Sequence, residues 1–222
     1  MNKAVAAVFD MDGTLVDNMG FHADAWLQTA ARLGVSGLTV EVFEQHYAGK
    51  KNEEIFPELL GRAVDDDDLR RWAWDKEALY REIAGAHIKP MPGLLAFLDE
   101  LRARGVAIAV ATAASPENRK LVFDACGLHS RVDVVVGGED VTRGKPAPDI
   151  FLKAAQRLGI DPGDCVAFED GRNGVLSAVA AGMAVVGVVT TTPAPTMLAA
   201  GCFCTLTDFG VRPAAVDARL LR

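Results

Sequence analysis

Short apolar runs alternate with amphipathic stretches over most of the chain. The runs predict buried strands at Val5–Phe9, Val106–Ala111, Val132–Val136, Val166–Phe168 and Ala184–Val189. Apolar positions at helical spacing predict helices at Gly93–Arg104, Pro116–Cys126, Pro148–Leu158 and Asn173–Ala181. Strands that alternate with helices in this way favour an α/β fold with a doubly wound, Rossmann-like parallel sheet.

The stretch between the first two strands has a different texture, with helical spacing throughout and no strand-like run. It predicts helices at Phe21–Leu33, Thr39–Tyr47, Asn52–Leu60, interrupted by Pro57, and Asp65–Ile83, whose acidic start suits a helix N-terminus. Pro90, Pro92 and Gly93 mark the far boundary. We therefore expect a sheet domain formed by residues 1–18 and 90–222, interrupted by a helical insert at 19–89. The tail from Asp208 onward carries no clear pattern.

Composition narrows the class of protein. The 222 residues are 50% hydrophobic and 24% charged, as in a soluble globular protein, and the net charge of −7 argues against nucleic acid or an anionic membrane as a partner. No apolar run approaches the ~20 residues of a membrane span. Met1–Lys3 leads straight into the first strand and leaves no room for a signal peptide, and no cysteine pair has metal or redox spacing. We expect a cytoplasmic protein, monomeric by default, with reduced cysteines.

Chemistry-bearing residues follow the predicted strands. Asp10 and Asp12 follow the first strand, Thr112 the second, and the pair Glu169 and Asp170 the fourth, while Lys145 lies in a loop framed by glycine and prolines. Taken singly, each fits a turn, a solvated loop or an ordinary helix cap. Taken together, the acids lie where an open parallel sheet keeps its ligands, and they need a cation such as Mg²⁺ or lysine between them.

These residues also match ordered sequence signatures. Asp10-Met11-Asp12-Gly13-Thr14-Leu15-Val16-Asp17 resembles the DxDGTxxD motif of the haloacid dehalogenase superfamily, and Thr112, Lys145 and Glu169-Asp170 resemble its later signatures. The resemblance implies phosphoryl transfer, with Asp10 as nucleophile, Asp12 as general acid and base, and Thr112, Ala113 and Lys145 on the phosphate. It also implies Mg²⁺ held by Asp10, Asp170 and the Asp12 backbone carbonyl, with Glu169 direct or through water. The insert occupies the place of that family's helical, type-one cap.

The insert decides between branches of the family. The insert resembles the cap of β-phosphoglucomutase and related sugar phosphatases, and this resemblance implies that substrate is contacted by His22, Lys50, Lys51, Asn52 and Lys76. The mutases have an arginine where this chain has Asn52, and an amide cannot supply a charged fork to a second phosphate. We therefore favour a phosphatase acting on a small phosphate ester, such as a sugar phosphate, over a mutase, and both over a non-catalytic binding module. The sequence does not name the physiological substrate.

Overall fold

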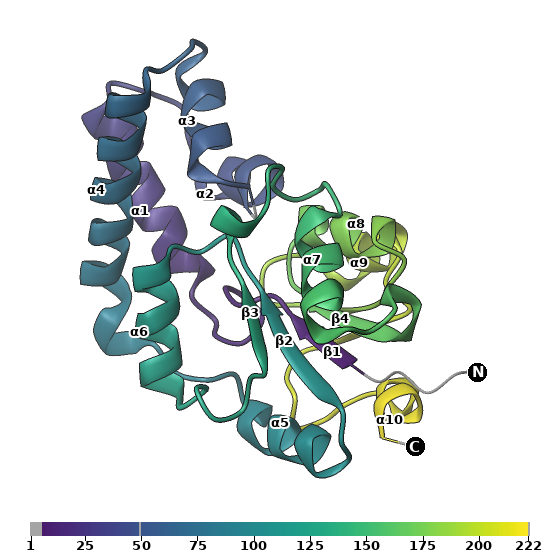
Figure 1. Ribbon diagram of the computed structural model, residues 1–222. Helices are drawn as coiled ribbons and strands as arrows, with labels where there is room; N and C mark the ends of the chain where they lie inside the picture. Colours follow the sequence, from purple (N-terminus) through teal and green to yellow (C-terminus); the bar gives the residue numbers. More distant parts are fainter. Residues whose placement is uncertain (1–5, 49, 222) are drawn as a thin grey trace.

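The computed structural model describes residues 6–48 and 50–221, so Val5, the expected start of the first strand, lies outside it. Six parallel strands form one sheet in the order β3-β2-β1-β4-β5-β6. Figure 1 labels β1 to β4 of this sheet. Their bounds are β1 Ala6–Phe9, β2 Ala107–Ala111, β3 Val134–Val136, β4 Cys165–Glu169, β5 Ala184–Val188 and β6 Cys204–Leu206. The expected doubly wound parallel sheet is confirmed.

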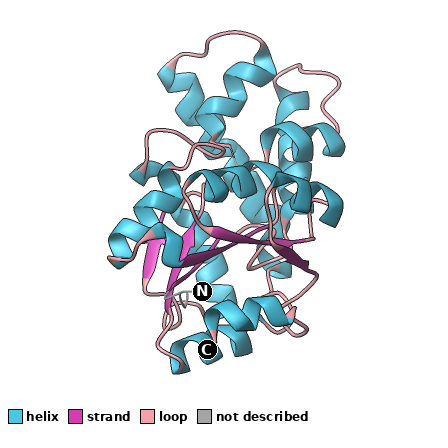
Figure 2. Ribbon diagram, turned by 90° about the vertical axis from the view of Figure 1, so that its right-hand side faces the viewer, coloured by secondary structure: helices cyan, strands magenta, loops and turns pink. Residues whose placement is uncertain are grey.

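Helices cover both faces of this sheet (Figure 2). One face carries α5 (Leu94–Ala103), α6 (Pro116–Cys126) and α10 (Ala214–Leu220), and the other carries α7 (Asp149–Leu158), α8 (Arg172–Ala180) and α9 (Ala194–Ala200). Successive residues of a strand point to opposite faces, so Phe9 packs in the first layer and Val8 in the second. Because the strands are covered on both faces, they read in the sequence as continuous apolar runs.

The insert at residues 19–89 contains helices and, among its described residues, no strand of the sheet. It comprises α1 (Met19–Arg32), α2 (Val40–Val42), α3 (Asn52–Leu60) and α4 (Asp66–Ala84), with α1 and α4 side by side (Figure 1). These helices bury an apolar cluster of their own around Trp26 and Phe56, whose ring centroids lie 4.9 Å apart. The chain enters and leaves this segment along neighbouring paths, because Met91 N donates to Leu15 O at 2.9 Å.

Two details of the insert differ from the sequence prediction. The expected helix at Thr39–Tyr47 is a short α-helix that continues as a π-helix over Phe43–Tyr47, closed by a bond from Ala48 N to Phe43 O. Pro57 does not interrupt α3, although it removes one backbone donor. Ile55 and Phe56, directly before it, are buried, and this packing holds the helix together.

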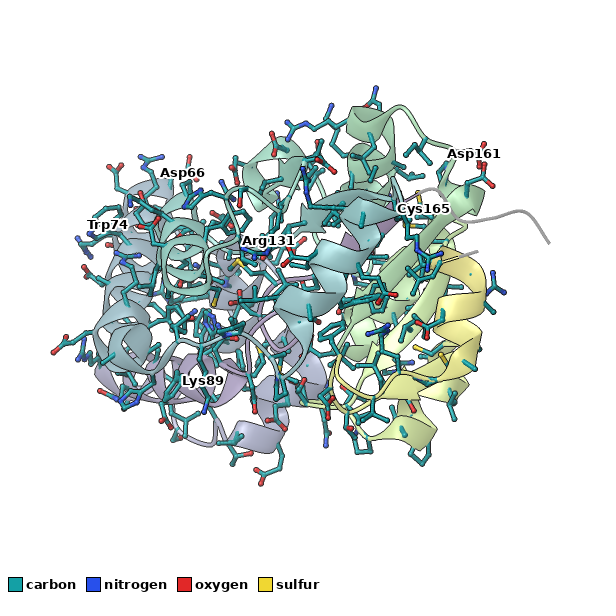
Figure 3. The ribbon with its side chains drawn as sticks, turned by 90° about the horizontal axis from the view of Figure 1, so that it is seen from below. Asp66, Trp74, Lys89, Arg131, Asp161 and Cys165 are labelled. Carbon is teal, nitrogen blue, oxygen red and sulfur yellow. The ribbon has the colours of Figure 1, made fainter. Side chains whose placement is uncertain are left out.

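Other features follow the prediction closely. Asp65 caps α4 by accepting hydrogen bonds from Asp67 N and Asp68 N, so the acidic run is a solvent-exposed helix start; Figure 3 shows Asp66 at the outside of the molecule. Cys165 lies in β4, and the cysteines of the described residues are free thiols. Short 3-10 turns occur at Gly85–His87, Gly138–Asp140 and Pro162–Asp164. Within residues 6–48 and 50–221, no helix is long and apolar enough to cross a membrane.

Candidate active site

Three carboxylates meet at the C-terminal edge of the sheet. Asp10 directly follows β1, Glu169 ends β4 and Asp170 follows it, and the pairing of Phe9 with Phe168 brings these ends together. All three side chains are buried, and one oxygen from each lies within 4.8 Å of the others. This arrangement, expected from the strand ends, could hold a metal ion.

The charges at this edge are not balanced by protein groups alone. Burial raises the pKa of Asp10 well above its ordinary value, and the charges of Glu169 and Asp170 add to this effect while Lys145 opposes it. Burial, followed by the charge of Glu169, raises the pKa of Asp170 to about 7. The oxygen-only donor set and the excess negative charge both fit a hard divalent cation at this position.

Lys145 is the cation that the protein itself supplies. Its Nζ lies 2.5 Å from Asp10 Oδ1, 2.6 Å from Glu169 Oε1 and 3.2 Å from Ala111 O. Burial would lower the pKa of Lys145, but the charges of Asp10 and Glu169 outweigh it and raise the pKa, so the ammonium stays charged. The Lys145–Pro146 peptide is cis.

Two glycines make room for the acid pair. A Cβ at Gly174, in the first turn of α8, would lie 1.9 Å from the Glu169 carboxyl carbon. A Cβ at Gly13, whose φ is +79°, would lie 2.1 Å from Asp170 Oδ2. Both positions therefore exclude any larger residue unless the carboxylates move.

Thr112 and Ala113 follow the end of β2, the strand that pairs with β1 on the side away from β4. The Thr112 hydroxyl accepts a hydrogen bond from Ala114 N at 3.0 Å, and its side chain is buried. Ser115 caps α6 and Pro116 occupies its first turn. Both Thr112 and Ala113 line the same cavity as Asp10, which brings the expected phosphate-contacting residues together.

Asp12 is held by groups from the insert and from the linker. Its Oδ1 accepts from Asn18 Nδ2 at 2.6 Å and lies 3.6 Å from His22 Nε2. Burial would raise the pKa of Asp12, but His22 and the Asn18 amide outweigh it and lower the pKa. Asn18 also bonds to Tyr80 of α4 at 2.6 Å, and Tyr80 stacks on the His22 ring. Asn18 and Tyr80 were not predicted at the site, because neither residue belongs to a recognisable motif.

Lys76 orients the His22 ring from the side of α4. Its Nζ lies 3.2 Å from His22 Nδ1 and 2.9 Å from Glu77 Oε1. Because an ammonium only donates hydrogen bonds, Nδ1 must act as the acceptor, and a ring proton then lies on Nε2, which faces Asp12. The insert therefore reaches the carboxylate that the sequence predicts to be the general acid and base.

A cavity of about 80 Å³ lies between the sheet edge and the insert. The core contributes Asp10, Asp12, Thr112, Ala113, Lys145, Glu169 and Asp170, and the insert contributes His22, Lys50, Asn52 and Lys76, together with apolar side chains. A second cavity of about 320 Å³ adjoins it, with Asn52, Glu77, Ala113 and Ala114 lining both. The structure thus brings together all but one of the residues expected at the site.

The exception is Lys51. Its Nζ donates to Val141 O of the core at 2.6 Å, and its side chain lines only the second cavity. Lys50 lines the first cavity, but its Nζ is paired with Glu58 at 2.8 Å. Asn52 donates to Glu77 Oε1 at 2.8 Å. Neighbouring lysines therefore have different positions, because successive residues entering a helix point in different directions.

Comparisons with known proteins agree with this geometry. The model of the haloacid dehalogenase-like hydrolase family matches residues 5–182. Hexitol phosphatase A of Escherichia coli (strain K12) is 34% identical over 181 residues, covering 82% of this chain and 81% of that protein. Fructose-1-phosphate phosphatase YqaB of the same organism is 32% identical over 182 residues, covering 82% and 94%. The crystal structure of a HAD hydrolase, family IA, variant 3, from Entamoeba histolytica HM-1:IMSS superposes with a TM-score of 0.85 at 26% identity, covering 98% and 99%.

Proposed function

The chain belongs to the haloacid dehalogenase-like hydrolase family, and on that premise we propose that it is a Mg²⁺-dependent phosphatase acting through an aspartyl phosphate on Asp10. We further propose that its substrate is a small phosphorylated metabolite of the sugar phosphate class. The observation that carries the proposal is the buried cluster of Asp10, Glu169, Asp170 and Lys145 at one sheet edge, facing a cavity beneath the insert.

In the first half-reaction, a carboxylate oxygen of Asp10 attacks phosphorus and the bond from phosphorus to the leaving oxygen breaks. Asp12 gives its proton to that leaving oxygen. The pKa of Asp12 is lowered in the structure, but an approaching phosphate dianion would raise it and favour the protonated form that this step needs. Thr112, Ala113 and Lys145 would hold the non-bridging oxygens.

In the second half-reaction, a water molecule attacks phosphorus and transfers a proton to Asp12, and the bond to Asp10 breaks to release inorganic phosphate. The lowered pKa of Asp12 suits this step, because the carboxylate is then ready to act as a base. His22 and Asn18 would keep that carboxylate pointing into the cavity.

We propose that Asp10, Asp170 and the backbone carbonyl of Asp12 hold Mg²⁺, with Glu169 binding directly or through water. When bound, the ion would offset the charge of the carboxylates and of the phosphate together. Lys145 already occupies the space between Asp10 and Glu169, so the ion would complete a charge balance that the lysine begins.

We propose that residues 19–89 form a cap domain that opens to admit substrate and closes over Asp10. Support comes from the size of the cavity, about 80 Å³, which is small beside the ~300–1,000 Å³ of typical small-molecule sites. A sugar phosphate would therefore enter with the insert displaced. Closure would bring His22, Lys50, Asn52 and Lys76 over the reacting groups.

A phosphatase fits the insert better than a mutase. A mutase must hold a second phosphate while the sugar turns around, and this requires a free cationic fork. Asn52 is neutral and is bonded to Glu77, while the Lys50 ammonium is paired with Glu58. The curated relatives named above are phosphatases of a hexitol phosphate and of fructose 1-phosphate, which favours a similar substrate for this chain.

The test is release of phosphate from p-nitrophenyl phosphate with Mg²⁺ and with EDTA, beside a panel of sugar and polyol phosphates. We expect Mg²⁺-dependent turnover and the highest kcat/KM on one panel member. Glucose 1-phosphate converted to its isomer without phosphate release would establish the mutase instead. Phosphate binding without any turnover would establish a binding module. Size-exclusion chromatography tests the expected monomer.

A further inference from the structure

Asn118 belongs to the core helix α6, and its side chain is fully buried where α6 packs against the insert helix α4. Its Nδ2 donates to Glu77 Oε2 at 2.6 Å, and its Oδ1 accepts from Arg81 Nη1 at 3.0 Å. Glu77 and Arg81 are four residues apart, so they lie one turn from each other on one face of α4. The amide, which has one donor end and one acceptor end, matches this carboxylate and guanidinium in a single orientation.

Glu77 connects this contact to the catalytic cavity. Its Oε1 accepts from Asn52 Nδ2 at 2.8 Å and from Lys76 Nζ at 2.9 Å, and both partners line the cavity above Asp10. Burial would raise the pKa of Glu77, but Lys76, His22 and Asn52 outweigh it and lower the pKa to about 2. Glu77 is thus an ionised, buried group with two hydrogen-bond partners in the insert and a third, Asn118, in the core.

We propose that Asn118 is a positioning residue that holds α4 in register on α6 and thereby keeps Lys76 and Asn52 over the candidate nucleophile Asp10. This inference rests on the proposed function and assigns the contact that stabilises the closed insert. Opening the insert breaks both Asn118 bonds and returns Glu77 and Arg81 to water. Closing it without the amide would leave Glu77 Oε2 buried without its core partner, which penalises the closed state alone.

Other contacts join the insert to the core from the side of α3. Lys51 Nζ donates to Val141 O, and Gly144 N donates to Glu54 Oε1 at 3.3 Å. These contacts are only partly buried and involve backbone groups of a loop. The Asn118 contact differs because its bond to Glu77 is buried, and because it joins two regular helices and bonds to two charged side chains. It therefore defines how α4 sits on the core (Figure 1).

The experiment exchanges the amide and the carboxylate. Asn118→Ala removes both bonds, and Asn118→Asp retains the acceptor for Arg81 but places a second carboxylate against Glu77. The double variant Asn118→Asp with Glu77→Gln restores a donor–acceptor pair in reverse, and the new side-chain amide on α4 keeps an oxygen for Asn52 and Lys76. Lys120→Ala is the matched control, since Lys120 lies on the same helix, is exposed and, among residues 6–48 and 50–221, pairs with Asp124 of its own helix alone.

Two readouts are needed, namely kcat/KM for p-nitrophenyl phosphate and the radius of gyration of the substrate-free protein by small-angle X-ray scattering. We expect Asn118→Ala to lower kcat/KM roughly tenfold and to increase the radius of gyration, because the closed population falls. Asn118→Asp should lower kcat/KM further and increase the radius of gyration further. The double variant should return both quantities most of the way to their wild-type values. Lys120→Ala should match the wild type.

Wild-type kcat/KM and radius of gyration in Asn118→Ala would overturn the proposal. So would a double variant no better than Asn118→Asp alone, since a purely space-filling role predicts no recovery. If a single variant fails to fold, recovery of folding and activity in the double variant would support the proposal, and no recovery would overturn it. Scattering needs no turnover, so an inactive wild type would refute the proposed function while the comparison of shapes still tests the role of Asn118.

Discussion

The Nζ atom of Lys145 lies 2.5 Å from Oδ1 of Asp10, so a lysine from the loop before α7 binds the carboxylate that follows β1. Both groups are buried, and neither is stable in that environment without a partner of opposite charge. The candidate nucleophile is thus held in place by a residue that lies 135 positions away in the sequence. Substitution of either residue tests this pairing.

Lys145→Met should abolish turnover and make folding depend on metal. The methionine fills the space but leaves Asp10, Glu169 and Asp170 without the lysine ammonium. Breaking a buried ion pair in this way lowers the free energy of unfolding by about 3–5 kcal/mol. We expect a lower Tm in EDTA, and a larger rise in Tm on adding Mg²⁺ than the wild type shows. Thermal unfolding followed by circular dichroism measures both. An equal Mg²⁺-induced rise in the two proteins would contradict the proposed charge balance.

Asp10→Asn should abolish turnover while leaving the fold and phosphate binding intact. The substitution is nearly isosteric, and the amide oxygen can still accept the Lys145 hydrogen bond, but the nucleophile is lost. Circular dichroism and titration with inorganic phosphate check the fold and the site. More than a few per cent of wild-type activity, with deamidation excluded by mass spectrometry, would mean that no covalent bond forms on Asp10.

The metal-free protein should become less stable as the pH rises. The pKa of Asp170 is about 7 in the folded state against an ordinary value of 3.8, and the pKa of Asp10 is raised too. Between those values the folded protein binds more protons than the unfolded chain, so the free energy of unfolding falls with increasing pH. This contribution is complete below 3.8 and is lost as the pH passes about 7.

Urea unfolding in EDTA from about pH 5 to about pH 8 measures this dependence. Mg²⁺ should restore stability at the upper end of the range, where the carboxylates are ionised. Asp170→Asn is the control, because it removes one of the two raised groups and should flatten the profile. Stability that increases over the same range in EDTA would show that the carboxylates are already balanced within the protein.

Much of the core of the site could be predicted from the sequence. Asp10, Thr112, Glu169 and Asp170 each lie at or directly after the end of a strand, and parallel strands bring their C-terminal ends to one edge. Lys145 is the exception, because it lies in the loop before α7. Asp10 and Glu169 are far apart in the chain, yet both follow from the rule that a buried strand ends where the apolar run ends. The cap of α6 at Ser115 depends only on neighbouring residues, so a local sequence pattern is enough to indicate it.

The contacts between the insert and the core could not be predicted in this way. Glu77 and Asn118 meet only because α4 and α6 pack side by side, and no local pattern in either helix encodes that meeting. Lys50 and Lys51 are adjacent in sequence, but one lines the catalytic cavity and the other reaches Val141 of the core. The elements β6, α9 and α10 were missed because each is only three to seven residues long, too short for a periodic pattern.

Gly174→Ala should disrupt the acid pair even though alanine favours helices. Its Cβ would lie 1.9 Å from the Glu169 carboxyl carbon, so this carboxylate must leave its position. We expect loss of turnover and a weaker Mg²⁺-induced rise in Tm. Gly20→Ala is the matched control, because Gly20 is helical and exposed and its added Cβ meets nothing within 4 Å. It should be neutral or stabilising by about 0.5–1 kcal/mol. Wild-type activity in Gly174→Ala would show that Glu169 can act from another position.

The two lysines at the start of α3 should have separable effects. Lys50 lines the cavity, and we expect Lys50→Ala to weaken only the use of a substrate with polar groups beyond its phosphate. Lys51 holds the core loop through Val141 O, and we expect Lys51→Ala to lower kcat/KM for every substrate by loosening closure. The measurement is kcat/KM for p-nitrophenyl phosphate and for the best sugar phosphate from the panel, with Lys120→Ala as control.

A loss of about tenfold on the sugar phosphate alone, roughly 1.4 kcal/mol of transition-state binding, would assign specificity to Lys50. Because p-nitrophenyl phosphate has no distal hydroxyl to lose, it reports only closure and chemistry. Equal losses on both substrates in Lys50→Ala would mean that this lysine, with its partner Glu58, stabilises the insert instead. A selective loss in Lys51→Ala would mean that the sugar extends into the second cavity, which Lys51 lines, and that specificity is determined there.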